Sequence, residues 1–234
     1  MSTFLDEEWS WKTLSLWKYL EEGNIPSHWQ EFFFQDKVQQ KLQEISKHLE
    51  EEKKTSIIYP PINRVFRAFF LNPKKIRVVI LGQDPYHNGN AVGLCFSVPT
   101  KAGMNPSLVN IYNELESEGY VPKRDGNLQK WADQGVFLIN TALTVNKGDA
   151  GSHTKYWYSF TEMLVSYLCE SNIVWLLMGK DAIEFSPLIK KGKTVSSSHP
   201  SPLSAHRPYR EHPAFIGSGV FRKVNDFLEK KIIW

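Results

Sequence analysis

The chain has 234 residues, enough for one sizeable hydrophobic core and short for two domains. Its 41% hydrophobic and 23% charged residues are typical of a soluble globular protein, and no apolar run is long enough to span a membrane. A net charge of +3 is too small to indicate nucleic-acid binding by itself.

The termini and cysteines indicate an intracellular protein. The first residues are acidic and lack a basic segment followed by an apolar one, so we expect no signal peptide. Cys95 and Cys169 lie inside apolar runs, which predicts two buried thiols in a reducing compartment. That compartment would be the cytoplasm for a bacterial protein and the host nucleus for a viral one.

Charge is distributed unevenly along the chain. Acidic clusters gather in residues 1–60, whereas basic residues gather late, at Lys190, Lys191, Lys193, Arg207, Arg210, Arg222 and Lys223. A basic stripe can neutralise phosphates, and ordinary solvated lysines are an equal alternative.

Strand and helix patterns alternate along the chain. Helical patterns cover residues 9–22 and 27–53, followed by predicted strands at 76–81, 136–145, 173–178 and 193–198, with helices at 105–119, 156–172 and 220–231. This order predicts an α/β fold with a central four-stranded, mainly parallel sheet flanked by helices on both faces. We expect one domain over residues 1–234, with an N-terminal helical part at 1–54 and the main core at 55–234.

Polar residues follow or interrupt each predicted strand. Open parallel sheets bind ligands at the carboxyl ends of their strands, so these side chains should face one crevice. Asn140 alone falls in the middle of its strand, the second. The others, at strand ends, are Gln83, Asp84, Tyr86, His87, Gly179, Lys180 and His199.

Five motifs in one order resemble those of the family 1 uracil-DNA glycosylases. They are GQDPYH (82–87), GLCFSV (93–98), NPS (105–107), LINTALTV (138–145) and HPSPLSAHR (199–207), and YPP (59–61) also fits. The resemblance covers about residues 55 to 230 and makes 55–234 the catalytic core. It implies hydrolysis of the uracil–deoxyribose bond in DNA, the first step of base excision repair, without a metal or cofactor.

Asn140 is the predicted reader of the base. A uracil buried in a duplex must be flipped into a pocket, where it presents an N3–H donor and an O4 acceptor. One amide satisfies both groups, whereas cytosine reverses the pattern and leaves buried polar groups unpaired. The alternative is that Asn140 caps a strand or turn.

The resemblance assigns three further residues to the base pocket. Tyr86 would block the C5 methyl of thymine, and a rigid ring in the path of that methyl rejects it by a steric clash. Phe96 would stack on the flipped base, although a phenylalanine at this position is otherwise an ordinary core residue. Gln83 would line the pocket.

Asp84 and His199 are the predicted catalytic residues. Glycosidic cleavage produces a cationic sugar and a departing uracil anion. A carboxylate at Asp84 can position water and favour the cation, and a neutral imidazole at His199 can donate to uracil O2. An Asx turn or helix cap is the alternative for Asp84.

Other residues are predicted to contact DNA. Leu203 lies in a polar loop and, by the resemblance, fills the gap that the flipped base leaves. The remaining predicted DNA contacts are His87, Pro106, Ser107, Gly179, Lys180, Ser201, Ser204 and Arg207.

The sequence departs from the family pattern at three places. The loop NGNAVG is one residue short, with Val92 where a second histidine is common. Lys180 stands where serine is usual, and would either contact phosphate or point into solvent. RPYREHPAFIG (207–217) inserts several residues into the leucine loop, and because some herpesvirus members have such a loop, a viral source is one interpretation.

Three alternatives and several partners complete the sequence predictions. A flavodoxin-like protein lacks support because no phosphate-cradling glycine-rich loop is present. Zinc binding by His199, His206 and His212 would need an unusual spacing. A third alternative is a catalytically weakened DNA-binding scaffold. The expected partners of a monomeric enzyme are uracil-containing single- and double-stranded DNA, proteinaceous glycosylase inhibitors and replication proteins.

Overall fold

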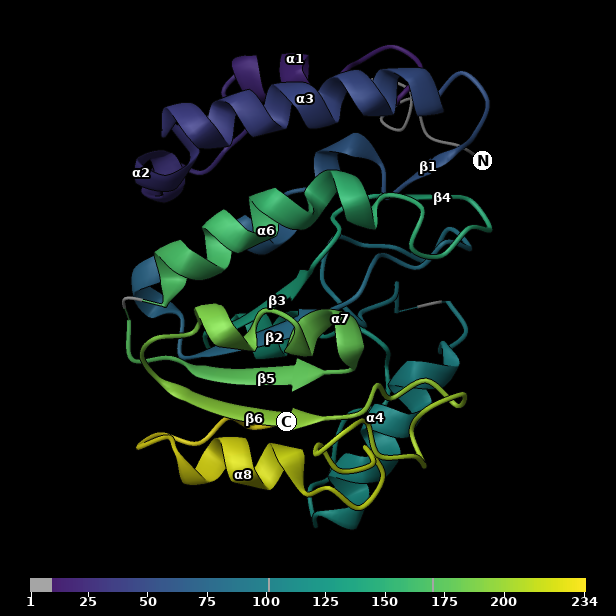
Figure 1. The fold of residues 1–234 in the computed structure, drawn as a ribbon. Coiled ribbons are helices and arrows are strands. Elements are labelled where there is room, and N and C mark those ends of the chain that lie inside the picture. Colours follow the sequence, from purple (N-terminus) through teal and green to yellow (C-terminus); the bar gives the residue numbers. More distant parts are fainter. Residues whose placement is uncertain (1–9, 101, 170) are drawn as a thin grey trace.

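A four-stranded sheet forms the centre of the computed structural model, which describes residues 10–100, 102–169 and 171–234 (Figure 1). Its strand order is β3-β2-β5-β6, and every neighbouring pair is parallel. The strands are β2 (Val78–Gly82), β3 (Val136–Asn140), β5 (Val174–Met178) and β6 (Lys193–Ser197). The predicted α/β architecture is therefore confirmed, and the sheet is parallel throughout.

The second predicted strand ends earlier than expected, which corrects the placement of Asn140. Asn140 is the last residue of β3 and lies opposite Gly82 of β2. The Thr141 amide still donates to the Gly82 carbonyl at 2.9 Å, and residues 141–143 then bend away from the strand direction. The rest of the run forms β4 (Val145–Asn146), which pairs antiparallel with β1 (Ile58–Tyr59).

Helices cover both faces of the sheet. α6 (Thr154–Leu168) lies over one face beneath α3 (Asp36–Glu52) and α1 (Leu16–Glu21), and α8 (Val220–Asp226) covers the other (Figure 1). α4 (Pro106–Ser117) lies near the carboxyl ends of the strands. The remaining helical segments are α2 (Gln30–Phe33), α5 (Gln129–Ala132), α7 (Lys180–Ile183) and the 3-10 segments η2 (Ser27–Trp29), η3 (Ile62–Arg64), η4 (Arg67–Phe70), η5 (Pro73–Lys75) and η6 (Ser186–Leu188).

The last helix is shorter than its pattern predicts. α8 ends at Asp226, whereas the sequence predicted a helix to residue 231. The side chain of Asn225 accepts from the Ile232 amide at 2.8 Å and donates to its carbonyl at 3.0 Å. These two bonds turn the tail back onto the helix, so the polar residues between them do not continue it.

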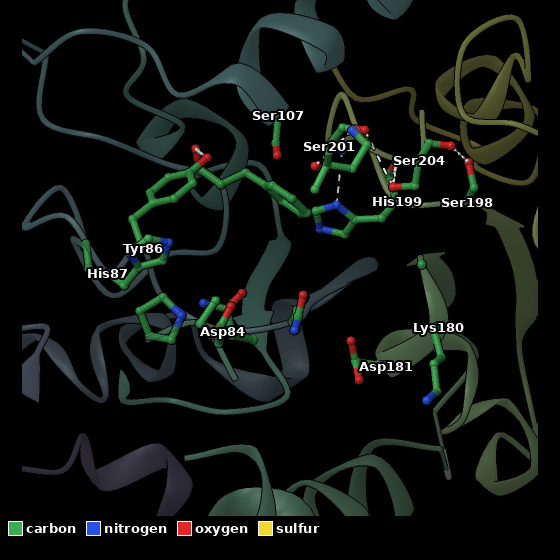
Figure 2. Close-up of a pocket in the computed structure, with 18 of the residues that line it drawn as sticks. Asp84, Tyr86, His87, Ser107, Lys180, Asp181, Ser198, His199, Ser201 and Ser204 are labelled. Atoms are coloured by element: carbon green, nitrogen blue, oxygen red, sulfur yellow. Dashed lines mark hydrogen bonds between the residues drawn. The ribbon is translucent and has the colours of Figure 1, made fainter. Parts of the chain in front are cut away.

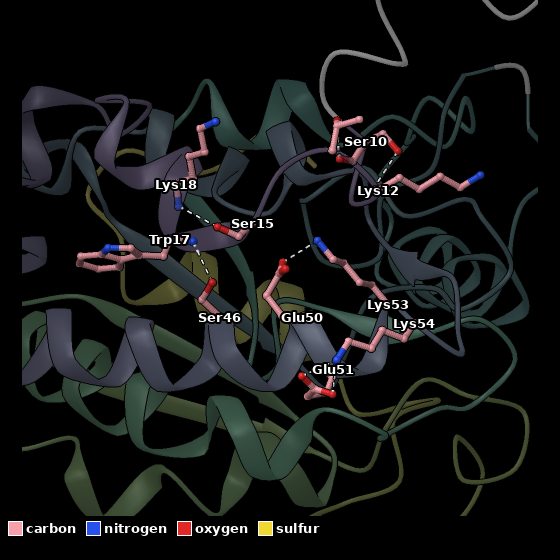
Figure 3. Close-up of polar contacts among 11 residues, drawn as sticks. Ser10, Lys12, Ser15, Trp17, Lys18, Ser46, Glu50, Glu51, Lys53 and Lys54 are labelled. Atoms are coloured by element: carbon pink, nitrogen blue, oxygen red, sulfur yellow. Dashed lines mark hydrogen bonds and ion pairs between the residues drawn. The ribbon is translucent and has the colours of Figure 1, made fainter.

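The N-terminal helices are tied together by polar contacts. The Trp17 amide of α1 donates to Ser46 Oγ of α3 at 3.0 Å, and Ser15 Oγ caps α1 by accepting from Lys18 (Figure 3). On the outer side of α3, Lys53 pairs with Glu50 at 2.8 Å. α1 and α3 therefore form one layer over α6.

Both cysteine thiols are buried, as predicted. In the described ranges, none of the helices combines the length and apolar character that crossing a bilayer requires.

Trp29 joins the N-terminal segment to the sheet. Its indole is fully buried and stacks on Phe137 of β3 at a centroid distance of 5.4 Å. Its Nε1 donates to the Leu71 carbonyl at 2.8 Å. This one side chain thus combines apolar burial with a satisfied polar group.

We expect Trp29→Ala to lower the free energy of unfolding by about 3–5 kcal/mol, because it leaves a cavity and an unpaired carbonyl. Urea denaturation followed by far-ultraviolet circular dichroism measures this change. The control is Phe34→Ala, since Phe34 is 62% exposed. That variant should change the value by less than about 0.5 kcal/mol, and equal losses would contradict a structural role for Trp29.

Candidate active site

A cavity of about 580 Å³ opens at the carboxyl ends of the strands (Figure 2). Its wall includes Asp84 after β2, Asn140 at the end of β3 and His199 after β6. Parallel strands direct their following loops to the same edge of the sheet, which is why residues distant in sequence meet here. The predicted convergence of polar side chains is therefore observed.

Asp84 is held by a backbone amide from another loop. The Gly151 amide donates to Asp84 Oδ2 at 2.6 Å. Burial raises the pKa of Asp84, the Gly151 amide and nearby His87 lower it, and the negative charge of Asp181 raises it further. The geometry fixes the carboxylate while the apolar surroundings oppose its ionisation.

Asn140 presents an uncommitted amide to the cavity. Within the described residues its side chain forms no hydrogen bond, although it is only partly exposed. Gly82 makes room for it, since a Cβ on Gly82 would lie 2.4 Å from Asn140 Oδ1. Both the carbonyl oxygen and the amino group therefore remain available to a ligand.

Tyr86 and Phe96 form a rigid aromatic wall. The Tyr86 hydroxyl donates to the Phe96 carbonyl at 3.1 Å, and burial raises the pKa of Tyr86, so this phenol stays protonated. Phe96 has a φ of 61°, a left-handed conformation that costs energy for a residue with a large side chain. Its ring lies 5.7 Å from that of His199, centroid to centroid. The strain is stored at the cavity wall.

His199 is held as a neutral imidazole of one tautomer. The Ser201 amide donates to His199 Nδ1 at 3.0 Å, so the ring proton of the neutral form resides on Nε2. Burial lowers the pKa of His199 to about 4. Gly179, with a φ of 91°, packs against this side chain, because a Cβ there would lie 2.7 Å from His199 Cβ. The site thus offers an N–H donor without a positive charge.

Leu203 projects from a loop whose base is firmly held. Leu203 is 87% exposed. Beneath it, Ser204 Oγ donates to the His199 carbonyl at 3.0 Å, and Asn110 of α4 donates to the Pro200 carbonyl at 2.8 Å. An exposed leucine on a supported loop fits a wedge.

The other predicted site residues divide into two groups. Pro106 begins α4 and does not line the cavity, whereas its neighbour Ser107 does. Lys180 lies at the rim, with Nζ 3.9 Å from Glu184 Oε1, which is consistent with a weak surface pair. The residues that do line the cavity are Gln83, His87, Ser107, Gly179, Lys180, Ser201, Ser204 and Arg207.

Some residues in or beside the cavity were not predicted as site residues from the sequence, among them Asp181, Gly151 and Tyr209. Asp181 is half-buried beside Lys180 (Figure 2), and burial and then Glu184 raise the pKa of its carboxyl. Its position next to the GK pair was the available signal. Gly151 contributes only its backbone amide, which leaves no trace in sequence, and Tyr209 lines the cavity from the inserted loop.

The inserted loop is closed by a short turn. Tyr209 and His212 exchange two backbone hydrogen bonds of 3.0 and 2.9 Å, and Ser196 Oγ lies 2.7 Å from His212 Nδ1. His212 therefore fastens the loop to β6, while His199 bonds to Ser201. Over the residues that the structure describes, no three His, Cys, Asp or Glu side chains gather in an arrangement that could hold a metal ion.

Comparisons with known proteins agree on one family. The model of the uracil DNA glycosylase superfamily matches residues 69–227. The uracil-DNA glycosylase of Psychromonas ingrahamii is 42% identical, covering 88% of this chain and 99% of its own. That of Saimiriine herpesvirus 2 is 38% identical, covering 96% and 98%.

Solved structures give the same result. Mimivirus uracil-DNA glycosylase is similar with a TM-score of 0.84 and 30% identity, covering 91% of this chain and 88% of its own. A mimivirus UNG variant in complex with UGI also has a TM-score of 0.84, with 31% identity and coverage of 91% and 90%. The match of family model, sequence and fold over most of the chain leads to one conclusion: this protein belongs to the uracil-DNA glycosylase superfamily.

Proposed function

We propose that the cavity binds a uracil nucleotide flipped out of DNA and that Asp84 and His199 cleave its glycosidic bond. The protein is a uracil-DNA glycosylase: it hydrolyses the bond between uracil and deoxyribose, releases uracil and leaves an abasic site for base excision repair. The observation that carries the assignment of roles is the meeting of Asp84, Asn140 and His199 in one cavity.

Recognition of the base rests on Asn140. Its free amide can accept from uracil N3–H and donate to O4, which a cytosine edge cannot match. Tyr86 limits the space at C5, because its hydroxyl bond to the Phe96 carbonyl holds the ring in place. Phe96 stacks on the base, and Gln83 lines the same pocket.

Cleavage separates opposite charges that two residues stabilise. The bond between C1′ and N1 breaks with its electron pair on uracil, and the Nε2–H of His199 donates to the O2 atom of that anion. The Asp84 carboxylate stabilises the cationic sugar and orients water, whose oxygen bonds to C1′ while its proton passes to Asp84. A neutral His199 suits this role because its Nε2–H is already available as a donor before the bond breaks.

The DNA surface surrounds the cavity. Leu203 enters the base stack, and Ser107, Ser201 and Ser204 contact phosphates beside Arg207 and Lys180. His87 supports the loop that carries Asp84. Both single- and double-stranded uracil-containing DNA fit this arrangement.

The remaining proposals concern organisation and partners. Residues 1–54 and 55–234 act together as one domain, since Trp29 packs on β3. The likeness to a mimivirus UNG variant in complex with UGI supports binding of a proteinaceous inhibitor to this chain as well. We extend the proposal to a monomer that meets replication proteins inside the cell, in the cytoplasm or the host nucleus according to its source.

Release of free uracil from single- and double-stranded DNA tests the assignment. Asn140→Asp should lower the rate on uracil by roughly 100-fold or more, the effect of losing about 3 kcal/mol of hydrogen bonding. It should gain cytosine release, because a protonated carboxyl matches the opposite edge. Asn127→Asp, on an exposed loop, is the matched control and should leave both rates unchanged. Unaltered base preference in Asn140→Asp would remove Asn140 from this role, and wild-type binding without uracil release would favour the scaffold.

Asp84→Asn should lose activity and gain stability. Loss of the carboxylate should lower kcat by roughly 10²–10⁴-fold. Because burial raises the pKa of Asp84, the charged form costs stability at pH 7, and the neutral amide should raise Tm by roughly 2–4 °C for about 1 kcal/mol. The gain should shrink as pH falls and Asp84 becomes protonated.

Thermal unfolding of both proteins from pH 8 to pH 4 measures that gain. Asp125→Asn provides a control of opposite sign. Against the cost of burial, bonds from Lys123 and the Asn127 amide lower the pKa of Asp125. That variant should therefore be destabilised at pH 7, and stabilisation of both variants would contradict the role of burial.

Asp181→Asn should shift the acid limb of kcat/KM to lower pH. The groups that act on Asp84 are the Gly151 amide, His87 and Asp181, and only the last raises its pKa by charge. Removing that charge lets Asp84 stay ionised in more acidic solution. Glu184→Gln should leave the limb in place, since Glu184 acts on Asp181 and not on Asp84. Equal pH profiles for Asp181→Asn and wild type would exclude this coupling.

A further inference from the structure

A second cavity, of about 710 Å³, lies beside the β3 edge of the sheet between the η3–η5 segments and α5. Its wall carries Arg64, Arg67 and Lys75, with Asp133 as an acidic member and Phe70 as an aromatic one. Its size is in the range of small-molecule sites. No role in uracil release has been assigned to it.

Arg67 is held in this wall by neutral groups. Its guanidinium donates to the Val92 carbonyl at 3.3 Å and to Gln129 Oε1 at 3.0 Å. Gln129 in turn donates to Asp133 at 2.9 Å, so the carboxylate is separated from Arg67 by an amide. Burial, and then the charge of Arg64, lower the pKa of Arg67. Two cations thus lie close together, one of them half-buried.

The scarcity of acidic partners distinguishes this cavity from a lysine-rich groove elsewhere on the protein. In the groove beside residues 10–12 and 53–59, Lys53 pairs with Glu50 and Lys54 pairs with Glu51 (Figure 3). In the part of the chain that the structure describes, Arg64, Arg67 and Lys75 form no ion pair. Among the described residues, three cations of the second cavity therefore lack an ion pair, whereas in the groove only Lys12 does.

The chemistry of the wall indicates more than a single anion. Arginines bind phosphate oxygens through paired N–H groups, and Lys75 adds a third cation. Phe70 is 66% exposed and offers a face for an aromatic ring. The Asn63 amide can donate to and accept from a base edge, and the Asn72 amino group can donate, since Asn72 Oδ1 accepts from the Lys74 amide at 2.9 Å.

We propose that this cavity binds a nucleoside polyphosphate, with the phosphates on Arg64, Arg67 and Lys75 and the base over Phe70. The proposed site is separate from the proposed DNA surface, but it adjoins the wall of the catalytic cavity on the side away from that surface. Arg67 bonds to the carbonyl of Val92, which lines the catalytic cavity, and Leu94 lines both cavities. The ligand would bind against the residues that support the catalytic wall.

Isothermal titration of ADP and of inorganic pyrophosphate into the full chain tests the proposal, with saturating uracil-free duplex present to cover the DNA surface. Arg64→Gln should weaken ADP binding at least tenfold. Lys130→Gln removes the same charge from the exposed face of neighbouring α5, outside the cavity, and should change it less than twofold. Phe70→Ala should weaken ADP and leave pyrophosphate unchanged.

Three results would overturn the proposal: no saturable ADP binding by the wild-type chain, equal losses in Arg64→Gln and Lys130→Gln, or displacement of ADP by the duplex. Arg67→Lys gives a second check, since it keeps the charge but loses the paired donors, and it should also weaken ADP. Uracil release by Arg64→Gln should stay within twofold of wild type. This separates failure of the second site from failure of the catalytic assignment.

Discussion

Burial of a carboxylate and an imidazole in one cavity is the constraint on which this site depends. The same burial raises the pKa of Asp84 and lowers that of His199, so it favours the neutral form of both. In the proposed reaction His199 acts as a neutral donor, whereas Asp84 must be ionised to stabilise a cation. The Gly151 amide and His87 lower the pKa of Asp84 and so favour its ionised form, and they have no such effect on His199. Charges in a partly buried site interact more strongly than charges in water, so the same burial would strengthen the proposed stabilisation of the cation by Asp84.

The loop that carries Leu203 and the segments that carry Asp84 and Asn140 depend on different supports. Asp84 and Asn140 follow strands of the sheet, whereas the Leu203 loop rests on α4. The buried carboxylate of Glu114 in α4 accepts from the amides of Gly217 and Gly219, at 2.7 and 2.8 Å, where the inserted segment ends. A loop that is held at both ends loses little conformational entropy on binding. Insertion of Leu203 into DNA, as proposed, would therefore cost less free energy. The insertion therefore lengthens the loop without releasing it.

The sequence predicted those site residues that act through their side chains and that lie close to the end of a predicted strand. Asp84 and His199 stand directly after strands, where parallel topology makes convergence necessary. The end of β3 was missed because Thr141 and Ala142 look like strand residues. Their amides still bond to the carbonyls of Gly82 and Gln83, but the chain bends at residues 141–143, and the pattern of this segment alone does not show that bend.

Other misses share that cause. The amide of Gly151 has no sequence signature, because every residue except proline carries the same group. The early end of α8 depends on Asn225 bonding to Ile232, beyond the helix itself. Asp181 stands next to Lys180 in the sequence, but its effect on the pKa of Asp84 depends on their proximity in the folded chain.

The departures from the family pattern replace one kind of interaction with another. Val92, where a histidine is common, is buried, and its carbonyl accepts from Arg67, so packing and a guanidinium hold a loop that would otherwise carry an imidazole. At the rim of the cavity, Lys180 stands where serine is usual and is followed by Asp181. These neighbouring side chains carry opposite charges, and their local effects differ. The ammonium faces outward, whereas the carboxylate acts inward on Asp84. The negative charge of Asp181 therefore raises the pKa of Asp84, while the Lys180 ammonium forms a weak pair with Glu184 at 3.9 Å.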